Sequence, residues 1–198
     1  MQKSGVEEYW QIVWMRFKSG DQEAFAILYN HHIDPLYHFG TKLCKDTETV
    51  KDSLQELFLE LYLKREKINV GPENLKYYLL LALKRNLIKK MKSGRMSSQR
   101  WLESVDFEPE YSIEFQIIKQ EKEAEISQKI VKTLKQLPSK QREAIYLRFN
   151  ESLEYSEIAK ILDINVESVR KQVYRAIMTI REILNNEPFI NLFLLLKK

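Results

Sequence analysis

The stretch Ser152–Leu184, S-L-E-Y-S-E-I-A-K-I-L-D-I-N-V-E-S-V-R-K-Q-V-Y-R-A-I-M-T-I-R-E-I-L, has the pattern of two helices joined by a tight corner. The first helix is predicted from Tyr155 to Leu162, because apolar residues recur there at the i, i+3, i+4 and i+7 spacing of one helix face. The small Ala159 in its middle allows a second helix to cross closely at a steep angle. We therefore expect a compact helical pair to organise this part of the chain.

The corner is predicted at Asp163, Ile164 and Asn165. Asp163 occupies the place where a left-handed residue is usual, and Asp tolerates that conformation better than most residues do. Ile164 is expected to fill the core beneath the corner. Asn165 can accept a hydrogen bond from an N–H group of the next helix, with Val166 as its first residue.

The second helix combines a buried apolar face with a polar, basic one. The predicted buried residues are Val169, Val173, Ile177, Ile180 and Leu184. The polar residues are Glu167, Ser168, Arg170, Lys171, Gln172 and Arg175, preceded by Asn165. A helix that enters the major groove of DNA needs short polar groups and Gln or Arg near its N-terminus for base edges, with Arg and Lys flanking for phosphates. This pattern favours a DNA-reading helix-turn-helix over a helical hairpin with solvated charges.

The composition favours an all-α fold. Only five Gly and five Pro occur in 198 residues, of which 44% are hydrophobic and 30% charged. The start of the sequence lacks the pattern of a signal peptide, and no apolar run of about 18 residues is present, so we expect a cytoplasmic protein without stable membrane insertion. The single Cys44 forbids an internal disulfide and is expected in the core.

The charge distribution suggests two helical domains joined by a linker. Net charge is +3 over residues 1–92, −4 over 93–127 and +5 over 128–198. The predicted domains are residues 1–95 and 128–186, the second containing the helix-turn-helix. An acidic linker is predicted at 96–127 and an apolar tail at 187–198. Two basic bodies flanking an acidic connector suit two nucleic-acid-facing modules.

The first domain begins with a predicted helix from Val6 to Phe17, followed by a second one from Gln22 to His32. Asp34-Pro35 is expected to start a new helix, with Asp34 as its cap and Pro35 in its first turn.

The next helix, predicted from Thr47 to Arg65, carries a polar face of three acids and one amide. These residues are Asp52, Gln55, Glu56 and Glu60. Such a face is either simply solvated or suited to docking against a basic helix of a partner.

The helix after Gly71-Pro72 is aromatic at its head and basic in its second half. Tyr77 and Tyr78 precede a series of cations that includes Lys84, Arg85 and Lys89. Rings stack on unpaired bases and cations hold phosphates, so this combination suits capture of single-stranded nucleic acid. The alternative, in which the two tyrosines border the core and the charges are solvated, is equally open from the sequence.

Three further features are expected to be structural. Ser139 can cap a helix predicted from Lys140 to Phe149, and the linker aromatics Trp101 and Phe107 can dock on a partner or on the protein itself. The tail P-F-I-N-L-F-L-L-L-K-K is too short to span a bilayer, so docking on the last domain or on a protein partner is favoured over association with a membrane surface. His31, His32 and His38, together with Cys44, match no zinc-site spacing, so no metal is expected.

Taken together, four stretches resemble the RNA polymerase sigma factors of the extracytoplasmic-function group, in the sigma-seventy superfamily. They are D-Q-E-A-F-A-I-L-Y at Asp21–Tyr29, D-S-L-Q-E-L-F at Asp52–Phe58, L-P-S-K-Q-R-E-A-I-Y-L-R-F at Leu137–Phe149, and the helix-turn-helix. Glu154 and Asp163 depart from the Ser and Gly usual in the family.

The resemblance implies a role for each candidate set. Asp52, Gln55 and Glu56, with Glu60 on the same face, would bind core RNA polymerase. Tyr77, Tyr78, Lys84, Arg85 and Lys89 would melt and read the minus-ten promoter element. Asn165, Glu167, Ser168, Arg170, Lys171 and Arg175 would read the minus-thirty-five element. An anti-sigma factor is a further partner that the resemblance implies.

The implied function is promoter-specific transcription initiation without catalysis or a cofactor. No Gly-rich phosphate loop, metal-ligand cluster or carboxylate pair in the sequence suggests an enzyme. The alternative is a stand-alone helix-turn-helix regulator that acts as a dimer.

Overall fold

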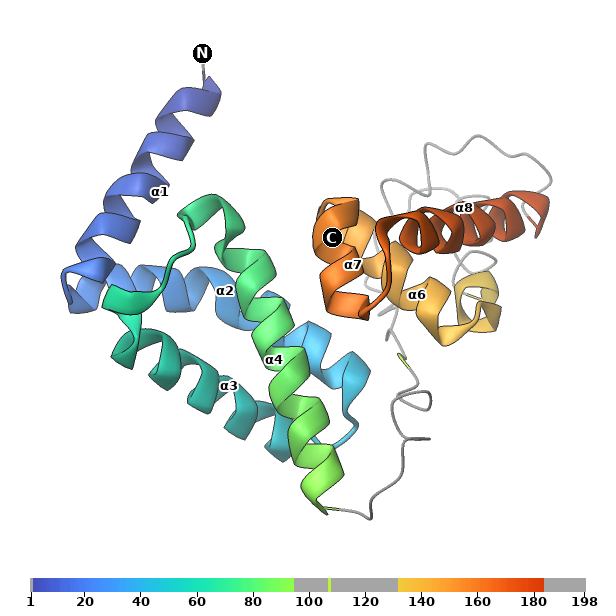
Figure 1. The fold of residues 1–198 in the computed structure, drawn as a ribbon, viewed down its shortest axis with the longest axis horizontal. Coiled ribbons are helices and arrows are strands. Elements are labelled where there is room, and N and C mark those ends of the chain that lie inside the picture. Colours follow the sequence, from blue (N-terminus) through green and yellow to red (C-terminus); the bar gives the residue numbers. More distant parts are fainter. Residues whose placement is uncertain (1, 95–106, 108–131, 184–198) are drawn as a thin grey trace, which may run out of the picture. The chain divides into compact units, whose positions relative to one another are not determined.

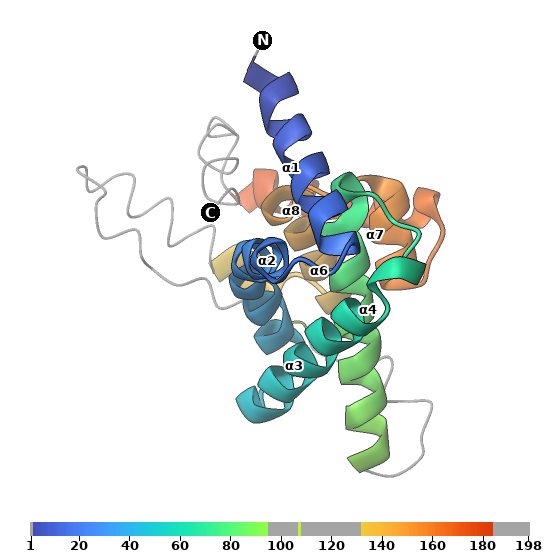
Figure 2. The same ribbon diagram turned by 90° about the vertical axis from the view of Figure 1, so that its left-hand side faces the viewer.

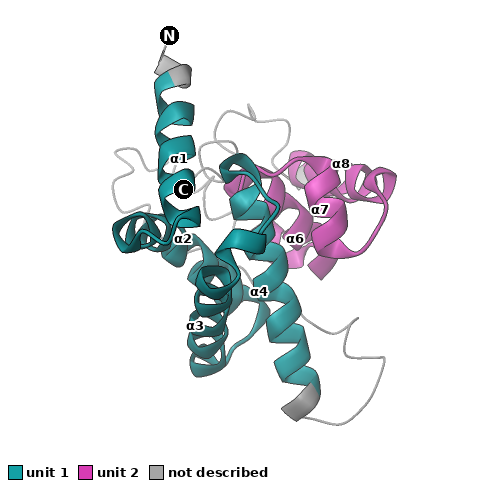
Figure 3. Cartoon of the chain, turned by 60° about the vertical axis from the view of Figure 1, so that its left-hand side comes forward, with its two compact units in different colours: residues 1–104 teal, residues 105–198 magenta. Residues whose placement is uncertain are grey.

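The structure is a computed structural model and describes residues 2–94, 107 and 132–183. All regular elements among these residues are helices, which confirms the predicted all-α fold (Figure 1). The chain divides into two compact units, Met1–Ser104 and Val105–Lys198 (Figure 3). The predicted linker at 96–127, apart from Phe107, and the predicted tail at 187–198 lie outside the described residues, so the predicted domain boundaries stay predictions.

The N-terminal unit is built on three helices that pack against one another. These are α2 (Gln22–Leu43), α3 (Thr47–Leu63) and α4 (Pro72–Gly94), each in contact with the other two. A first helix, α1 (Gln2–Lys18), packs on α2, and a short 3-10 helix, η1 (Arg65–Lys67), follows α3. The N-terminal half of α1 extends beyond the other helices of this unit (Figures 1 and 2).

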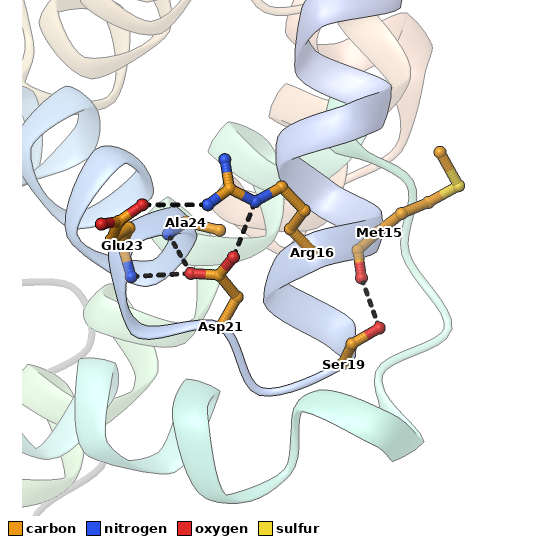
Figure 4. A network of polar contacts seen from close by, with 6 residues as sticks. All are labelled: Met15, Arg16, Ser19, Asp21, Glu23 and Ala24. Atoms are coloured by element: carbon orange, nitrogen blue, oxygen red, sulfur yellow. Dashed lines mark hydrogen bonds and ion pairs between the residues drawn. The ribbon is translucent and has the colours of Figure 1, made fainter.

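Asp21 fixes the corner between α1 and α2 (Figure 4). Its carboxylate accepts hydrogen bonds from the N–H groups of Glu23 at 2.9 Å and Ala24 at 3.1 Å, so it caps α2. Arg16 of α1 donates to the same carboxylate at 2.6 Å and to Glu23 at 3.1 Å. The Ala24 N–H and the Arg16 guanidinium together hold the pKa of the Asp21 carboxyl below its ordinary value.

The predicted helix break at Asp34-Pro35 is wrong, because α2 runs through Pro35 without interruption. Leu28 precedes the proline on the buried face, and Leu36 and Phe39 follow it. Packing of this continuous apolar face outweighs the backbone hydrogen bond that is lost because Pro35 has no N–H. Asp34 therefore caps nothing.

The crossing of α2 with α3 and α4 depends on Gly40. A Cβ atom at this position would lie 2.7 Å from Val50 Cγ1 on α3, and 3.6 Å and 3.7 Å from Leu83 and Leu87 on α4. Val50, Leu83 and Leu87 are themselves fully buried. The three helices can approach this closely because residue 40 has no side chain.

The C-terminal unit consists of helical residues 132–136 followed by a short helix and the predicted helical pair. Its elements are α6 (Ser139–Ile145), a π-helical turn η3 (Tyr146–Asn150), α7 (Tyr155–Leu162) and α8 (Val166–Ile183). The helix α8 packs against both α6 and α7. The predicted helix from Lys140 to Phe149 is therefore real, but it changes to π geometry after Ile145.

The backbone of the corner between α7 and α8 is formed as predicted, but Ile164, expected to fill the core beneath it, is only half-buried. Asp163 is left-handed, with φ 54° and ψ 48°, and Asn165 Oδ1 accepts a 2.7 Å hydrogen bond from the Ser168 N–H at the start of α8. The buried side of the pair differs in detail from the prediction. Ile161 is buried instead of Leu162, and Ala176 instead of Ile177, while Leu184 lies outside the described residues.

Phe107 docks on the C-terminal unit, and Ser139 does not cap α6 as predicted. The flanking position of α6 is Pro138, so Ser139 already lies inside the helix. Its hydroxyl instead accepts a 2.8 Å hydrogen bond from the Phe107 N–H. The Phe107 ring is fully buried and lies 5.3 Å from the Tyr146 ring, between centroids. Of the two docking alternatives for Phe107, the structure therefore selects the protein itself, whereas Trp101 lies outside the described residues.

Arg142 of α6 joins three backbone segments of this unit. Its Nε donates to the Phe107 carbonyl at 2.8 Å, and its Nη1 donates to the carbonyls of Lys135 at 2.8 Å and Leu137 at 2.9 Å. Only 8% of Arg142 is exposed. The buried guanidinium thus provides a charged donor to three backbone carbonyl groups.

Candidate nucleic-acid interface

The four polar residues predicted on α3 lie together on its exposed face. Asp52, Gln55, Glu56 and Glu60 are all exposed. At about 100° per residue they fall within roughly 140° of the helix circumference. The buried residues of α3 occupy the opposite side and are Val50, Ser53, Leu54, Leu57, Phe58 and Leu61. The set is therefore one surface, and Phe58 belongs to the core as predicted.

Glu56 connects this surface to α4. Its carboxylate lies 2.9 Å from Lys90 Nζ and accepts a 3.1 Å hydrogen bond from Asn86 Nδ2. These two groups, Lys90 first, hold the pKa of the Glu56 carboxyl below its ordinary value. Glu60 is paired within α3's own C-terminal turn, with Lys64. Asp52 and Gln55 are thus better probes of this surface than Glu56.

Two leucines extend the same face and were missed by the sequence analysis. Leu59 is 59% exposed and Leu63 is 68% exposed. Helix geometry places both within about 20° of Asp52 around α3. The sequence analysis made no prediction for these two residues, because the leucines at positions 57 and 61 already accounted for the buried face of the helix.

The residues predicted on α4 lie opposite its buried face. The buried side chains of α4 are Leu75, Leu79, Leu80, Leu83 and Leu87. Tyr77, Tyr78 and Lys84 are half-buried, and Arg85 and Lys89 are exposed. All five fall within roughly 140° of the helix circumference, so the structure brings them together as one aromatic and basic strip. The two tyrosines border the core and are also accessible, which combines the two alternatives left open above.

Five of the six residues predicted for the second helix of the pair share one face of α8, and the sixth, Asn165, precedes the helix as its cap. Asn165, Glu167, Arg170, Lys171 and Arg175 are exposed, and Ser168 is half-buried. Glu167 and Lys171 face each other, with 3.8 Å between the carboxylate and the ammonium. The buried residues Val169, Val173, Ala176 and Ile180 lie on the opposite side. The exposed side of α8 is therefore polar and basic over its first three turns.

Tyr174 lies in the middle of this face and was also missed. It is 64% exposed, and on the helix circumference it lies between Arg170 and Lys171. Its aromatic ring resembled a core residue in the sequence, since it neighbours the buried Val173. The exposure itself is the observation that identifies it.

The histidines of α2 are not arranged as a metal site. In the described ranges, no group of three or more His, Cys, Asp or Glu side chains is placed to hold a metal ion. Cys44 is a buried free thiol, as predicted. The described helices include none with the length and apolar run needed to cross a membrane.

His32 is instead a buried titratable group, and it makes the N-terminal unit sensitive to acid. It is 7% exposed, and burial, followed by the nearby His31 and Lys76, lowers its pKa to about 4 from 6.5. Between these two values the unfolded chain binds a proton that the folded chain does not, so stability falls as pH drops below 6.5. We expect a loss of about 2 kcal/mol at pH 5 relative to pH 7.5.

Urea unfolding at the two pH values measures this loss. His32→Asn should remove most of the pH dependence, whatever it does to stability at pH 7.5. His38→Asn, at an exposed position of the same helix, should leave it unchanged. An equal pH dependence in all three proteins would contradict the assignment to His32.

Two family models match the chain, and between them they cover the three surfaces described above. Sigma-70 region 2 matches residues 28–96, which include the exposed faces of α3 and α4. Sigma-70 region 4 matches residues 127–180, which include α7 and most of α8. Together the two models cover more than half of the chain.

Curated relatives align over nearly their whole length. The ECF RNA polymerase sigma factor SigK of Mycobacterium tuberculosis (strain H37Rv) is 22% identical over 174 residues, covering 86% of this chain and 90% of that protein. The ECF RNA polymerase sigma-E factor of Escherichia coli (strain K12) is 27% identical over 186 residues, covering 89% and 93%.

Solved structures show the same fold. CnrH, determined in complex with the cytosolic domain of CnrY, has a TM-score of 0.53 and 18% identity, covering 90% of this chain and 98% of that one. The sigma factor RpoE of Bartonella quintana, determined in complex with the anti-sigma factor NepR, has a TM-score of 0.54 and 22% identity, covering 81% and 96%. With both family models and these full-length relatives in agreement, the chain belongs to the sigma-70 family and is a sigma factor of the extracytoplasmic-function group.

Proposed function

We propose that this sigma factor binds core RNA polymerase through the exposed face of α3 and reads two promoter elements, one with α4 and one with α8. The observation that carries the proposal is the position of the predicted residues: on each of the three helices they gather on the face opposite the core. The chain adds no catalysis of its own, and the polymerase supplies the chemistry.

The surface of α3 suits a partner that is basic in one part and apolar in another. Asp52 and Gln55 are available for cationic or polar groups, and the exposed Leu59 and Leu63 on the same face are available for apolar ones. We include these two leucines in the polymerase-binding surface, together with Glu56 and Glu60.

The strip on α4 suits the minus-ten element in its unpaired state. Tyr77 and Tyr78 can stack on bases that leave the duplex, while Lys84, Arg85 and Lys89 hold the backbone phosphates. Stacking offsets the cost of unpairing, which amounts to a few kcal/mol per base.

The exposed face of α8 suits the major groove of the minus-thirty-five element. Arg170, Lys171 and Arg175 supply contacts to phosphates or guanine edges, and Asn165, Glu167 and Ser168 supply short polar groups at the start of the helix. Tyr174 adds an apolar ring to this surface. Because both units are parts of one chain held by the polymerase, two weak contacts act as one specific reader.

An anti-sigma factor is a further proposed partner. The RpoE structure with the same fold contains such a protein. A partner that covers the α3 face would exclude the polymerase, so we expect the two to compete. The alternative of a dimeric stand-alone regulator is not favoured by the family models or the relatives.

Binding to core polymerase tests the proposal with a matched pair of charge reversals. We expect Asp52→Arg to weaken capture of purified bacterial core polymerase by about tenfold or more, because it places a cation where the partner is expected to be basic. Glu7→Arg makes the same change at an exposed position of α1 and should bind as the wild type does.

Run-off transcription from a promoter selected by the wild-type holoenzyme should fall in parallel with capture. A folded wild-type protein that captures no polymerase would overturn the proposal. Equal binding by the two variants would move the contact away from the α3 face.

A further inference from the structure

Tyr155, the first residue of α7, lies beneath two arginines from other elements. The Arg148 guanidinium of η3 is 4.8 Å from the centre of its ring, and the Arg170 guanidinium of α8 is 5.7 Å from it. Both distances fall within the range of cation–π contacts. We propose that Tyr155 is a positioning residue for promoter recognition, which holds Arg170 so that it discriminates one base pair of the upstream element. This inference rests on the proposed DNA-reading role of α8.

The first arginine makes the ring a fixed platform. Arg148 Nη1 donates to the Leu153 carbonyl at 2.7 Å and lies 3.2 Å from a carboxylate oxygen of Glu154. Both acceptors lie in the segment that leads into α7. The carboxylate also offsets the repulsion between two guanidinium groups over one ring.

The N-terminus of α7 is held independently. The Glu154 N–H donates a 2.7 Å hydrogen bond to the Glu157 carboxylate, which closes the first turn of the helix. Tyr155 is the next residue after Glu154, and its side chain is half-buried. The ring therefore has a defined place before DNA arrives.

Arg170, unlike Arg148, is exposed, and it lies on the side of α8 that is proposed to face DNA. A free arginine side chain populates many rotamers, and ordering it on DNA costs entropy. Contact with the Tyr155 ring removes part of that freedom in advance. A base contact that requires one orientation of the guanidinium is strengthened more by this restriction than a loose phosphate contact is.

The contact with the Tyr155 ring leaves the N–H donors of Arg170 available for DNA. A cation–π contact attracts the guanidinium by its charge and uses none of its N–H groups as hydrogen-bond donors. Two of these N–H groups can donate together to a guanine edge, the contact that distinguishes this base from the other three. The Tyr155 ring thus restricts where the Arg170 guanidinium lies without occupying its N–H donors.

The predicted consequence is a change in base preference rather than a uniform loss of affinity. We expect Tyr155→Leu to reduce discrimination at one base pair by about five- to tenfold, with other positions unchanged. Tyr155→Phe keeps the ring and should keep the preference. Arg170→Ala should lose the preference at the same base pair.

The test is selection of promoters by full-length holoenzyme from a library with a randomised upstream element. The readout is the ratio of bases selected at each position. A general loss of binding or folding would not change this ratio at one position alone. Tyr62→Leu is the matched control, because Arg65 lies 4.9 Å over the Tyr62 ring in the N-terminal unit. This variant should leave the upstream preferences as they are.

The outcomes separate this inference from the proposed function. If Arg170→Ala changes no base preference, the DNA-reading assignment of Arg170 fails, and the role of Tyr155 falls with it. If Arg170→Ala removes a preference that Tyr155→Leu retains, the positioning role alone is overturned.

Arg170→Lys provides a second variant in case Tyr155→Leu does not fold. This variant retains the positive charge at an exposed position but lacks the planar guanidinium, so it should weaken the base preference at the same base pair. A wild-type preference in Arg170→Lys would also overturn the inference.

Discussion

Arg142→Ala is expected to destabilise the C-terminal unit by about 3–5 kcal/mol, the largest effect that we predict for a single substitution. The guanidinium donates to the carbonyls of Phe107, Lys135 and Leu137 while only 8% of the residue is exposed. Removing it leaves these carbonyls without their charged donor in a site that water reaches poorly. It also removes one of the two hydrogen bonds that tie Phe107 to α6, the other being the bond to Ser139.

Hydrogen exchange resolved by peptide measures this loss within the unit, alongside thermal unfolding of the full chain. Protection should fall in α6, α7 and α8 and stay unchanged in α2, α3 and α4. Arg175→Ala removes the same charge from an exposed position and should change stability by less than about 0.5 kcal/mol. Wild-type protection in Arg142→Ala would show that the three hydrogen bonds are not needed for the fold.

Gly40→Ala is expected to destabilise the N-terminal unit by about 2–3 kcal/mol, because the new methyl group would overlap Val50. The added Cβ would lie 2.7 Å from Val50 Cγ1, a separation that requires the Val50 side chain or the helices α2 and α3 to move. Alanine is otherwise the better helix former, which normally stabilises a helix by roughly 1 kcal/mol over glycine. The sign of the measured change therefore tells which effect dominates.

Two further variants make this prediction specific. Gly5→Ala introduces the same methyl group in α1 where nothing lies within 4 Å, so it should be neutral or slightly stabilising. Val50→Ala in the Gly40→Ala background removes the overlapping atom and should recover part of the lost stability. Urea unfolding of the four proteins gives the comparison, and a stable Gly40→Ala single variant would refute the close crossing.

The sequence predicted the helical pair well because its boundaries depend on local chemistry. Asn165 caps α8 with its own side chain, and Asp163 takes up the left-handed conformation that ends α7. Both effects act within a few residues and are therefore visible in the sequence. The faces of α3, α4 and α8 were predictable for a similar reason, since helix periodicity separates their polar and apolar residues.

The errors occurred where tertiary contacts decide the local structure. Pro35 was expected to begin a helix, but the buried face of α2 extends across it. Ser139 was expected to cap α6, yet its hydroxyl binds Phe107, which is 32 residues away in sequence. Leu59, Leu63 and Tyr174 were missed because they are apolar residues next to core positions, although helix periodicity places them on the polar faces.

The contacts of Glu56 with α4 connect the two helices that carry the proposed surfaces of the N-terminal unit. The carboxylate stands on the α3 face proposed for the polymerase, and it holds Asn86 and Lys90 on the helix proposed for the minus-ten element. A polymerase cation that draws Glu56 away would break this tie between α3 and α4, and DNA binding that shifts α4 would in turn release the carboxylate for the polymerase. Thermodynamic linkage makes the coupling reciprocal: the factor by which polymerase raises DNA affinity equals the factor by which DNA raises polymerase affinity. Recruitment and promoter opening would then be cooperative within the N-terminal unit, and this cooperativity would need no movement between the two units of the chain.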